Sequence, residues 1–332
     1  MDSYFNKKKV LVTGGTGLIG IPLVKKLYEM GAEVRVVSLD AESHFASPVE
    51  FIKGDLCDKD LCAEVVKNVQ VVFHLAGIKG GIGVAYSKAS TLLLKNILMN
   101  IEIMEAARKA NVDRFLYTSS ICIYPPAKVF KEENAWTGFP HPSDKFGGIA
   151  KLIGELQIES YKLQYNLGNF FIARPTNTYG PFDNFNPVSS LIIPALIYRI
   201  FNGENPLTIW GDGSAVRDFI FSEDAADFLI LMVIKNCPGP FNVGSGKPIS
   251  IKKVAEIIAR NAEKFIGKRI NLRFDKTKPM GEKYRVTDIK KAITQLGWSY
   301  KTDIESGILK TLEWYSLNKT QLLKRYNVLN EE

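Results

Sequence analysis

Val10-Leu-Val-Thr-Gly-Gly-Thr-Gly-Leu-Ile-Gly20 decides the fold of this chain. The β-branched run from Lys9 to Val12 predicts a buried strand, and the apolar stretch from Ile21 to Met30 predicts a helix. Glycines at 14, 15, 17 and 20 allow a tight turn between them and close approach of the backbone to a pyrophosphate at the helix N-terminus. A second strand is expected from Glu33 to Leu39. The stretch therefore predicts dinucleotide binding, and a glycine turn that binds no ligand is the alternative.

The composition is that of an ordinary globular protein. The 332 residues are 46% hydrophobic and 23% charged, which allows one large or two medium domains. We expect a cytoplasmic protein, because no apolar run approaches the roughly 18 residues of a membrane span and the N-terminus lacks an apolar signal segment. The four cysteines and three histidines are scattered. Neither a disulfide framework nor a metal site is expected.

The net charge of +8 raises the question of a nucleic-acid partner. The lysines are spread over many predicted helix faces, and no arginine-rich tract or alternation of aromatic and basic residues is present. We therefore expect no nucleic-acid and no membrane partner. Most of the charge is expected to be solvated surface, and a small part to serve an anionic substrate.

Predicted strands and helices alternate through the first half of the chain. After the first unit, strands are expected at 49–53, 69–75, 114–119 and 169–173, with helices at 59–67, 91–110 and 148–165; Gly80-Gly-Ile-Gly83 is expected to be a loop. This alternation predicts an α/β fold of the Rossmann type, a doubly wound parallel sheet with helices on both faces. Ligands of such sheets bind at the carboxyl ends of the strands, where Asp40, Asp55, Ala76, Ser120 and Arg174 are placed.

Proline, glycine and asparagine become frequent from about Pro175, and the predicted elements become shorter. We expect a dinucleotide-binding domain over residues 1–175, to which residues of about 216–240 return. Residues 176–332 would then form a smaller α/β domain that binds the substrate.

Motifs along nearly the whole chain resemble the extended short-chain dehydrogenase/reductases, in particular the sugar-nucleotide epimerase/dehydratase group. They are Thr13–Gly20, Gly54-Asp-Leu56, His74-Leu-Ala-Gly77, Tyr117-Thr-Ser-Ser-Ile-Cys-Ile-Tyr-Pro125, Arg174-Pro-Thr-Asn-Thr-Tyr-Gly-Pro181, Trp210-Gly-Asp-Gly213, Arg217-Asp-Phe219 and Phe241-Asn-Val-Gly-Ser245. Gly80-Gly-Ile82, Tyr179–Phe185 and Phe274–Pro279 are most similar to the GDP-L-fucose synthase and GDP-mannose 3,5-epimerase branches. The resemblance implies an NAD(P)-dependent enzyme that binds a nucleotide sugar. It also implies a homodimer, in which the two long helices pack between subunits.

The resemblance assigns catalytic roles to three residues. Ser120, four residues before Tyr124, would hydrogen-bond the sugar hydroxyl or ketone. Cys122 would be the base on the carbon beside the ketone, and a small packed thiol is the alternative. Lys151 would hold the nicotinamide ribose and lower the pKa of a neighbouring tyrosine by its charge.

The tyrosine itself is the departure from the family. It should stand four residues before Lys151, where this chain has Gly147, and the adjacent Phe146 has no hydroxyl. The second acid of the GDP-sugar relatives, a histidine, is replaced by Leu191. The usual acid for hydride transfer is therefore missing. We hypothesise that Ser120 and an ordered water near Lys151 substitute for it.

The remaining site residues concern the cofactor and the diphosphate. Asp40 is expected to bind the adenosine ribose, and no arginine follows it before Pro48, which favours NAD over NADP. Asp55 would lie near the adenine, and a turn or helix-cap aspartate is its alternative. The residues expected to line the cofactor are Gly14, Gly15, Thr16, Gly17, Leu18, Ile19, Gly20, Asp40, Asp55, Leu56, Leu75, Ala76, Gly77, Asn96, Lys151 and Pro175. Those expected around the substrate are Ser120, Asn177, Arg217 and Arg285, since the planar fork of arginine suits phosphate oxygens.

Three functions follow as hypotheses. The first is an enzyme that oxidises, reduces or epimerises a GDP-linked sugar at or next to C4. The second is a UDP- or dTDP-sugar epimerase or dehydratase. The third is a protein that binds a nucleotide sugar or NAD without catalysis, having lost the tyrosine.

Overall fold

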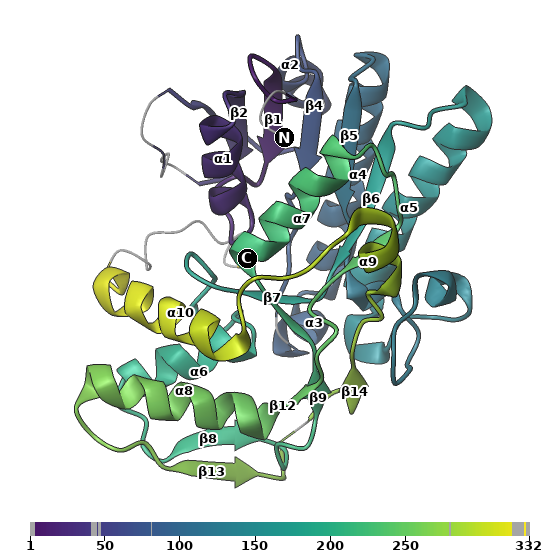
Figure 1. Cartoon of the computed structure of the whole chain (residues 1–332). Coiled ribbons are helices and arrows are strands. Elements are labelled where there is room, and N and C mark those ends of the chain that lie inside the picture. The colour runs from purple at the N-terminus through teal and green to yellow at the C-terminus, as the bar shows by residue number, and fades with distance from the viewer. Residues whose placement is uncertain are drawn as a thin grey trace.

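Seven parallel strands form the central sheet of the molecule (Figure 1). The computed structural model describes residues 4–40, 45, 48–80, 82–278, 280–320 and 329. The sheet has the order β11-β6-β5-β4-β1-β2-β3. Its strands are β1 (Lys9–Thr13), β2 (Glu33–Ser38), β3 (Glu50–Lys53), β4 (Val71–His74), β5 (Arg114–Thr118), β6 (Phe170–Pro175) and β11 (Phe241–Val243). The order reverses at β1, where a doubly wound sheet binds its ligands.

Helices cover both faces of this sheet. Successive residues of a strand point to opposite faces and so pack into two different hydrophobic cores. Val10 and Val12 of β1 pack with α1 (Gly20–Glu29) and α7 (Ser222–Ile234). Leu11 faces the other side, towards α2 (Lys59–Val65), α4 (Ala89–Lys109) and α5 (Lys145–Tyr165). Both faces of the strands are apolar, as buried parallel strands require. The sequence prediction of a doubly wound parallel sheet is confirmed.

A second, smaller group of elements lies below the sheet in Figure 1, around a core of its own. Its helices are α6 (Ile192–Phe201), α8 (Ile251–Ile266) and α10 (Ile304–Asn318). Its short strands are β7 (Asn177–Tyr179), β8 (Leu207–Trp210), β9 (Val216–Arg217), β10 (Phe219–Phe221), β12 (Ile249–Ser250), β13 (Leu272–Asp275) and β14 (Tyr284–Arg285). Between these elements the chain returns to the central sheet with α7 and β11, and α9 (Lys290–Leu296) packs against β11.

Residues 119–144 connect β5 to α5, and residues 75–88 connect β4 to α4. The first connection holds the 3₁₀ turns η1 (Ile121–Ile123), η2 (Glu132–Trp136) and η3 (Pro142–Asp144). The second holds α3 (Ile82–Ser87), where the sequence predicts a glycine loop. That prediction is wrong for residues 82 and 83, and Gly81 lies outside the described residues. Val84 is buried and packs with Ile78 and Leu92, so burial overrides the weak helix propensity of glycine.

Other boundaries shift by a few residues. The long helices begin at Ala89 and Lys145, two and three residues before the predicted starts, and β6 runs on to Pro175. Pro279, at the end of the motif that begins with Phe274, lies outside the described residues. No helix in the described part of the chain is long and apolar enough to cross a membrane.

Candidate functional site

The glycine turn connects β1 to α1, and three of its glycines are packed too closely to carry a side chain. A Cβ on Gly14 would lie 2.9 Å from the Ala76 backbone nitrogen, and one on Gly20 would lie 2.4 Å from the Gly14 carbonyl oxygen. A Cβ on Gly15 would lie 2.7 Å from Val36. Gly17 differs, since its Cβ would meet only the Gly14 oxygen, at 3.1 Å. Open space therefore lies over the start of α1.

The N-terminus of α1 fits the pyrophosphate of a dinucleotide. No side chain caps it, and its first turn holds no acidic residue. The orphan N–H groups and the positive end of the helix dipole are therefore open to an anion that approaches over Gly17. Beside the turn, the Thr16 hydroxyl lies 2.6 Å from that of Ser38, which ends β2. Leu18 is buried, and Ile19 immediately precedes the helix.

The two aspartates expected near the adenosine differ in surroundings. Asp40 lies just beyond β2, and its N–H donates to the Ser38 hydroxyl at 3.3 Å. Asp55 accepts the N–H of Cys57 at 3.0 Å, so it shapes the turn that follows β3. The cap of α2 is Asp58, which accepts from two backbone N–H groups. Leu56, between these turns, is buried.

The loop after β4 carries Leu75, Ala76 and Gly77 past the glycine turn. Asn96, from α4, holds this loop through backbone bonds only: its oxygen accepts from the Ile78 N–H at 2.9 Å and its amide donates to the Ile78 and Leu92 carbonyls. A Cβ on Gly77 would lie 3.4 Å from Lys151 Nζ. The absence of a side chain at Gly77 therefore lets the loop pass close to the ammonium group of Lys151.

Lys151 projects from α5 beneath the carboxyl end of β5. Its Nζ donates to the Thr118 carbonyl at 2.8 Å and lies 5.0 Å from the centre of the Tyr117 ring. Burial lowers the pKa of Lys151 to about 8. The ammonium is thus held at the strand ends but loses its proton more readily than a surface lysine does.

A buried hydrogen-bond chain behind Lys151 was not predicted from the sequence. His74 lies 2.7 Å from the Thr13 hydroxyl and 2.9 Å from the Asn100 side-chain oxygen. The Asn100 amide donates to the Tyr117 hydroxyl at 3.1 Å, and that hydroxyl donates to the Lys151 carbonyl at 3.3 Å. Burial and the charge of Lys151 lower the pKa of His74 to about 3, so the ring is neutral. The motif around His74 was the only sequence signal for this chain of bonds.

Ser120 and Cys122 lie in the turn that follows β5. The Ser120 oxygen accepts the N–H of Cys122 at 3.1 Å and so orders the first residues of η1. Gly148 packs α5 against this turn, because a Cβ there would lie 2.4 Å from the Cys122 carbonyl oxygen. A Cβ on Gly147 would meet no atom of the described residues within 4 Å. The position that lacks the tyrosine is therefore open space, one helical turn before Lys151.

The three residues expected around the diphosphate have different partners. Arg285 Nη1 lies 2.9 Å from a carboxylate oxygen of Asp144, and Nη2 donates to the sulfur of Cys122 at 3.4 Å. Arg217 donates to the Val216 carbonyl, and burial with the nearby charge of Arg285 lowers its pKa to about 10. The Asn177 amide donates to the Asp218 carbonyl at 2.9 Å. The structure thus brings Arg285 to the predicted base.

A buried ion pair supports the turn that carries Ser120 and Cys122. Arg174 and Glu155 form a bidentate pair, with 2.7 Å between Arg174 Nη2 and Glu155 Oε2. Arg174 also donates to the Tyr124 hydroxyl, which donates to Asn242 of β11 at 2.7 Å. Leu191, which the family resemblance sets in place of a histidine, immediately precedes α6.

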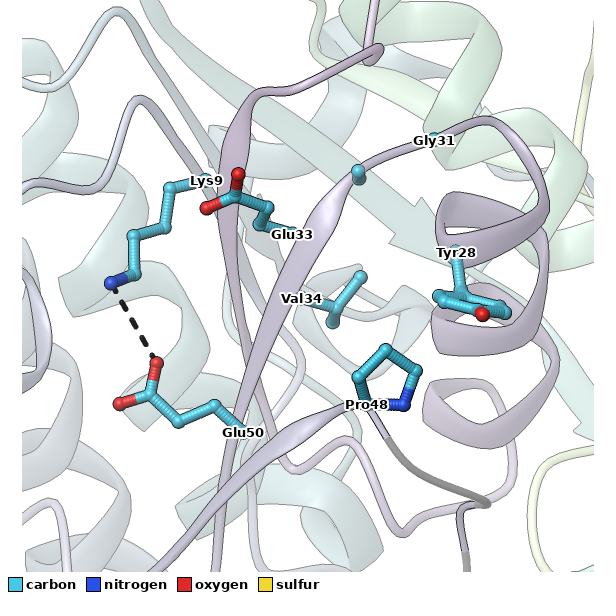
Figure 2. A pocket seen from close by; sticks show the side chains of 8 residues that line it. Lys9, Tyr28, Gly31, Glu33, Val34, Pro48 and Glu50 are labelled. Atoms are coloured by element: carbon cyan, nitrogen blue, oxygen red, sulfur yellow. Dashed lines mark ion pairs between the residues drawn. The ribbon is translucent and has the colours of Figure 1, made fainter.

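Figure 2 shows a pocket at the end of the strands that lies away from the glycine turn. Its lining residues are Lys9, Tyr28, Gly31, Ala32, Glu33, Val34, Pro48 and Glu50. Lys9, Glu33 and Glu50 begin β1, β2 and β3, so the pocket lies at the amino ends of these strands. Parallel sheets bind ligands at the carboxyl ends. The pocket is therefore separate from the candidate site.

Comparisons with known proteins identify the family and the fold of this chain. Residues 10–244 match the model of the NAD dependent epimerase/dehydratase family. A GDP-L-fucose synthase of Sinorhizobium fredii is 30% identical over 318 residues, which are 94% of this chain and 96% of the relative. A GDP-mannose 3,5-epimerase of Oryza sativa subsp. indica is 27% identical and covers 93% and 82%. The solved epimerase of Methanothermobacter thermautotrophicus superposes with a TM-score of 0.84 at 26% identity, over 96% of this chain and 95% of that one.

Proposed function

Because the chain belongs to the NAD dependent epimerase/dehydratase family, we propose that it is an enzyme that modifies a GDP-linked hexose or heptose at or next to C4. The observation that carries the proposal is the convergence of Ser120, Cys122 and Lys151 at the carboxyl end of β5, with open space at Gly147. The sugar would lie against these residues, and the remaining nucleotide against the segment 176–332, towards Arg217.

We propose NAD as the cofactor. When bound, it supplies hydride transfer at a carbon of the sugar. Gly17 and the start of α1 would hold its pyrophosphate, and Asp40 would bind its ribose hydroxyls and repel a 2′-phosphate. Lys151 would hold the ribose nearest the reacting ring.

The chain's own residues divide the chemistry between them. The Ser120 hydroxyl would orient the oxygen at C4 by hydrogen bonding. The Cys122 thiolate would take the proton from the carbon beside a C4 ketone and become a thiol, and the C–H electron pair would pass to an enolate. Return of a proton to that carbon restores the ketone, with inversion if it arrives on the other face. A water near Lys151, in the space at Gly147, would exchange the proton of the C4 oxygen.

The test is turnover of a panel of GDP-, UDP- and dTDP-linked sugars in deuterated water with NAD(H), followed by mass spectrometry. Deuterium retained in a GDP-sugar indicates epimerisation, and a mass change of two hydrogens indicates oxidation or reduction. Turnover of UDP- or dTDP-sugars alone would contradict the GDP assignment. No change in any sugar would contradict catalysis altogether.

Gly17→Val should weaken NAD binding by at least about tenfold, because the side chain enters the path of the pyrophosphate. The melting temperature of this variant should fall less than that of Gly20→Ala, since among the described residues its Cβ meets only the Gly14 oxygen, at 3.1 Å, whereas a Cβ on Gly20 would lie 2.4 Å from that oxygen. Calorimetric titration and thermal unfolding measure the two quantities. Gly20→Ala is the packing control and should lower the melting temperature. Unchanged NAD affinity in Gly17→Val would refute the site.

We also propose that the protein is a homodimer built on α4 and α5, which pack against each other. Leu94, Leu98 and Ile101 share one face of α4 and are 54%, 47% and 38% exposed, and Leu156 of α5 is 52% exposed. Such an apolar face on two adjacent helices is typical of a subunit interface.

Light scattering at micromolar concentration should give twice the chain mass, and Leu98→Glu should give a monomer. Leu317→Glu, at an exposed leucine of α10, is the matched control and should stay dimeric. A monomeric unmodified chain would reject this interface.

A further inference from the structure

Arg285 contacts the predicted base, Cys122, and lies beside two carboxylates. Its Nη2 donates to the Cys122 sulfur at 3.4 Å, and its Nη1 lies 2.9 Å from Asp144. Its Nε lies 3.6 Å from a carboxylate oxygen of Glu282. All three side chains that pair with Arg285 come from different parts of the fold: η1, η3 and the residues just before β14. We call Cys122, Asp144, Glu282 and Arg285 the thiol cluster.

We infer that Arg285 is a positioning residue that stabilises the thiolate of Cys122, and that Asp144 and Glu282 hold its guanidinium in place for that purpose. The inference rests on the proposed role of Cys122 as the base. It departs from the diphosphate role that the family resemblance implies for Arg285.

The geometry of the guanidinium supports this assignment. The planar fork of arginine presents its N–H groups in fixed directions. Here Nη2 and Nη1 contact Cys122 and Asp144, whereas Nε lies 3.6 Å from Glu282 and makes no hydrogen bond among the described residues. The side chain of Arg285 is 13% exposed, so its charge acts in surroundings with little water to screen it. A guanidinium so placed favours a neighbouring thiolate over the thiol.

The charges around the sulfur act in opposite directions. Burial raises the pKa of the Cys122 thiol and Asp144 raises it further, whereas Arg285 lowers it. Three further groups face the cluster from other elements. Arg217 interacts electrostatically with Arg285, and His141 interacts with Glu282. Lys151 faces Cys122 from α5. Arg285 is therefore the cation in contact with a thiol that its surroundings otherwise keep protonated.

Arg217 is the arginine that this arrangement leaves for the diphosphate. Among the residues that the structure describes, it forms no ion pair, and its guanidinium contact is to the Val216 carbonyl. Burial beside Arg285 disfavours two adjacent cations, and an incoming diphosphate would relieve that repulsion. The two arginines thus have different tasks, whereas the family resemblance assigns the diphosphate to both.

The test is the rate of alkylation of Cys122 by iodoacetamide in the full chain, from pH 6 to pH 10, with the Cys122 peptide quantified by mass spectrometry. Arg285→Met keeps the length of the side chain and removes its charge. We expect its alkylation at neutral pH to fall about tenfold and the midpoint to rise by about one pH unit. Asp144→Asn removes the charge that raises the pKa of Cys122, while its amide oxygen can still accept from Nη1 and hold Arg285 in place, so the midpoint should fall.

Arg217→Met is the matched control, and it should leave the alkylation profile unchanged while weakening GDP binding in calorimetry. Arg285→Lys keeps the charge without the fork, so its profile should lie between those of the unmodified chain and Arg285→Met. If Arg285→Met does not fold, Arg285→Lys and Asp144→Asn still give shifts of opposite sign. Superimposable profiles for Arg285 variants and the unmodified chain would overturn the inference, as would an equal shift in Arg217→Met.

The alkylation experiment needs no sugar. Its failure is therefore distinct from failure of the proposed function, which is read from deuterium in the product. An Arg285-dependent thiol in a chain that exchanges no deuterium would overturn the role of Cys122 as the base and leave its contact with Arg285 in place.

Discussion

Gly147→Tyr should raise the rate of hydride transfer by about 10²-fold, the effect of one positioned general acid. Among the described residues, a Cβ at Gly147 meets no atom within 4 Å, so the backbone of the helix accepts a Cβ there. The new hydroxyl would stand one helical turn from Lys151, whose charge lowers the pKa of a nearby phenol. The measurement is single-turnover oxidation or reduction of the sugar that the substrate panel identifies, followed by nicotinamide absorbance.

Gly147→Phe distinguishes the effect of the hydroxyl from the effect of the ring. If the chain lacks only the acid at position 147, phenylalanine adds bulk but no acidic proton, and the rate of hydride transfer stays near that of the unmodified chain. Equal acceleration by phenylalanine and tyrosine would contradict acid catalysis. A fall in both variants would mean that the substrate occupies the space.

Lys151→Met and Cys122→Ser should have unequal effects. Lys151→Met should lower both hydride transfer and deuterium exchange by about 10²-fold or more, because the lysine places the nicotinamide ribose and carries the charge beside the reacting oxygen. Cys122→Ser should suppress exchange and spare hydride transfer. Stopped-flow absorbance and deuterium incorporation measure the two activities in the same samples.

The pKa of Lys151 predicts how the rate of hydride transfer depends on pH. Burial lowers the pKa of Lys151 to about 8, so its ammonium form is lost as the pH rises through that value. Hydride transfer by the unmodified chain should therefore fall above about pH 8, and the residual activity of Lys151→Met should lack that decline. Lys145→Met, at an exposed lysine at the start of the same helix, is the control and should change neither activity. Full exchange in Cys122→Ser would sink the role of that residue.

The sequence predicts most of the central sheet because local pattern decides it. Each parallel strand is a short apolar run buried on both faces, and the glycines after β1 mark the turn into α1. Residues 82–87 were missed because the burial of Val84 depends on Leu92 and Ile78, which local glycine content does not reveal. The starts of α4 and α5 shift for the same kind of reason, since helix ends depend on what they pack against.

The candidate site is less predictable, because its contacts cross the chain. The family resemblance points to Cys122, Lys151 and Arg285, but the contact of Arg285 with Cys122 joins residues 163 positions apart. The bonds between His74, Asn100 and Tyr117 join β4, α4 and β5. No periodicity encodes such side-chain pairings; they follow from how the strands and helices are assembled.

The place of β11 in the sheet has a consequence for synthesis on the ribosome. This strand pairs with β6 through residues 241–243, and α7 covers the adjoining face with Phe228. A nascent chain that ends before residue 241 leaves β6 as an unpaired apolar edge, the kind of surface on which partly made proteins aggregate. The N-terminal part of the polypeptide, up to residue 240, thus depends on a later segment, and chaperones that shield nascent strands should associate with it until that segment has left the exit tunnel.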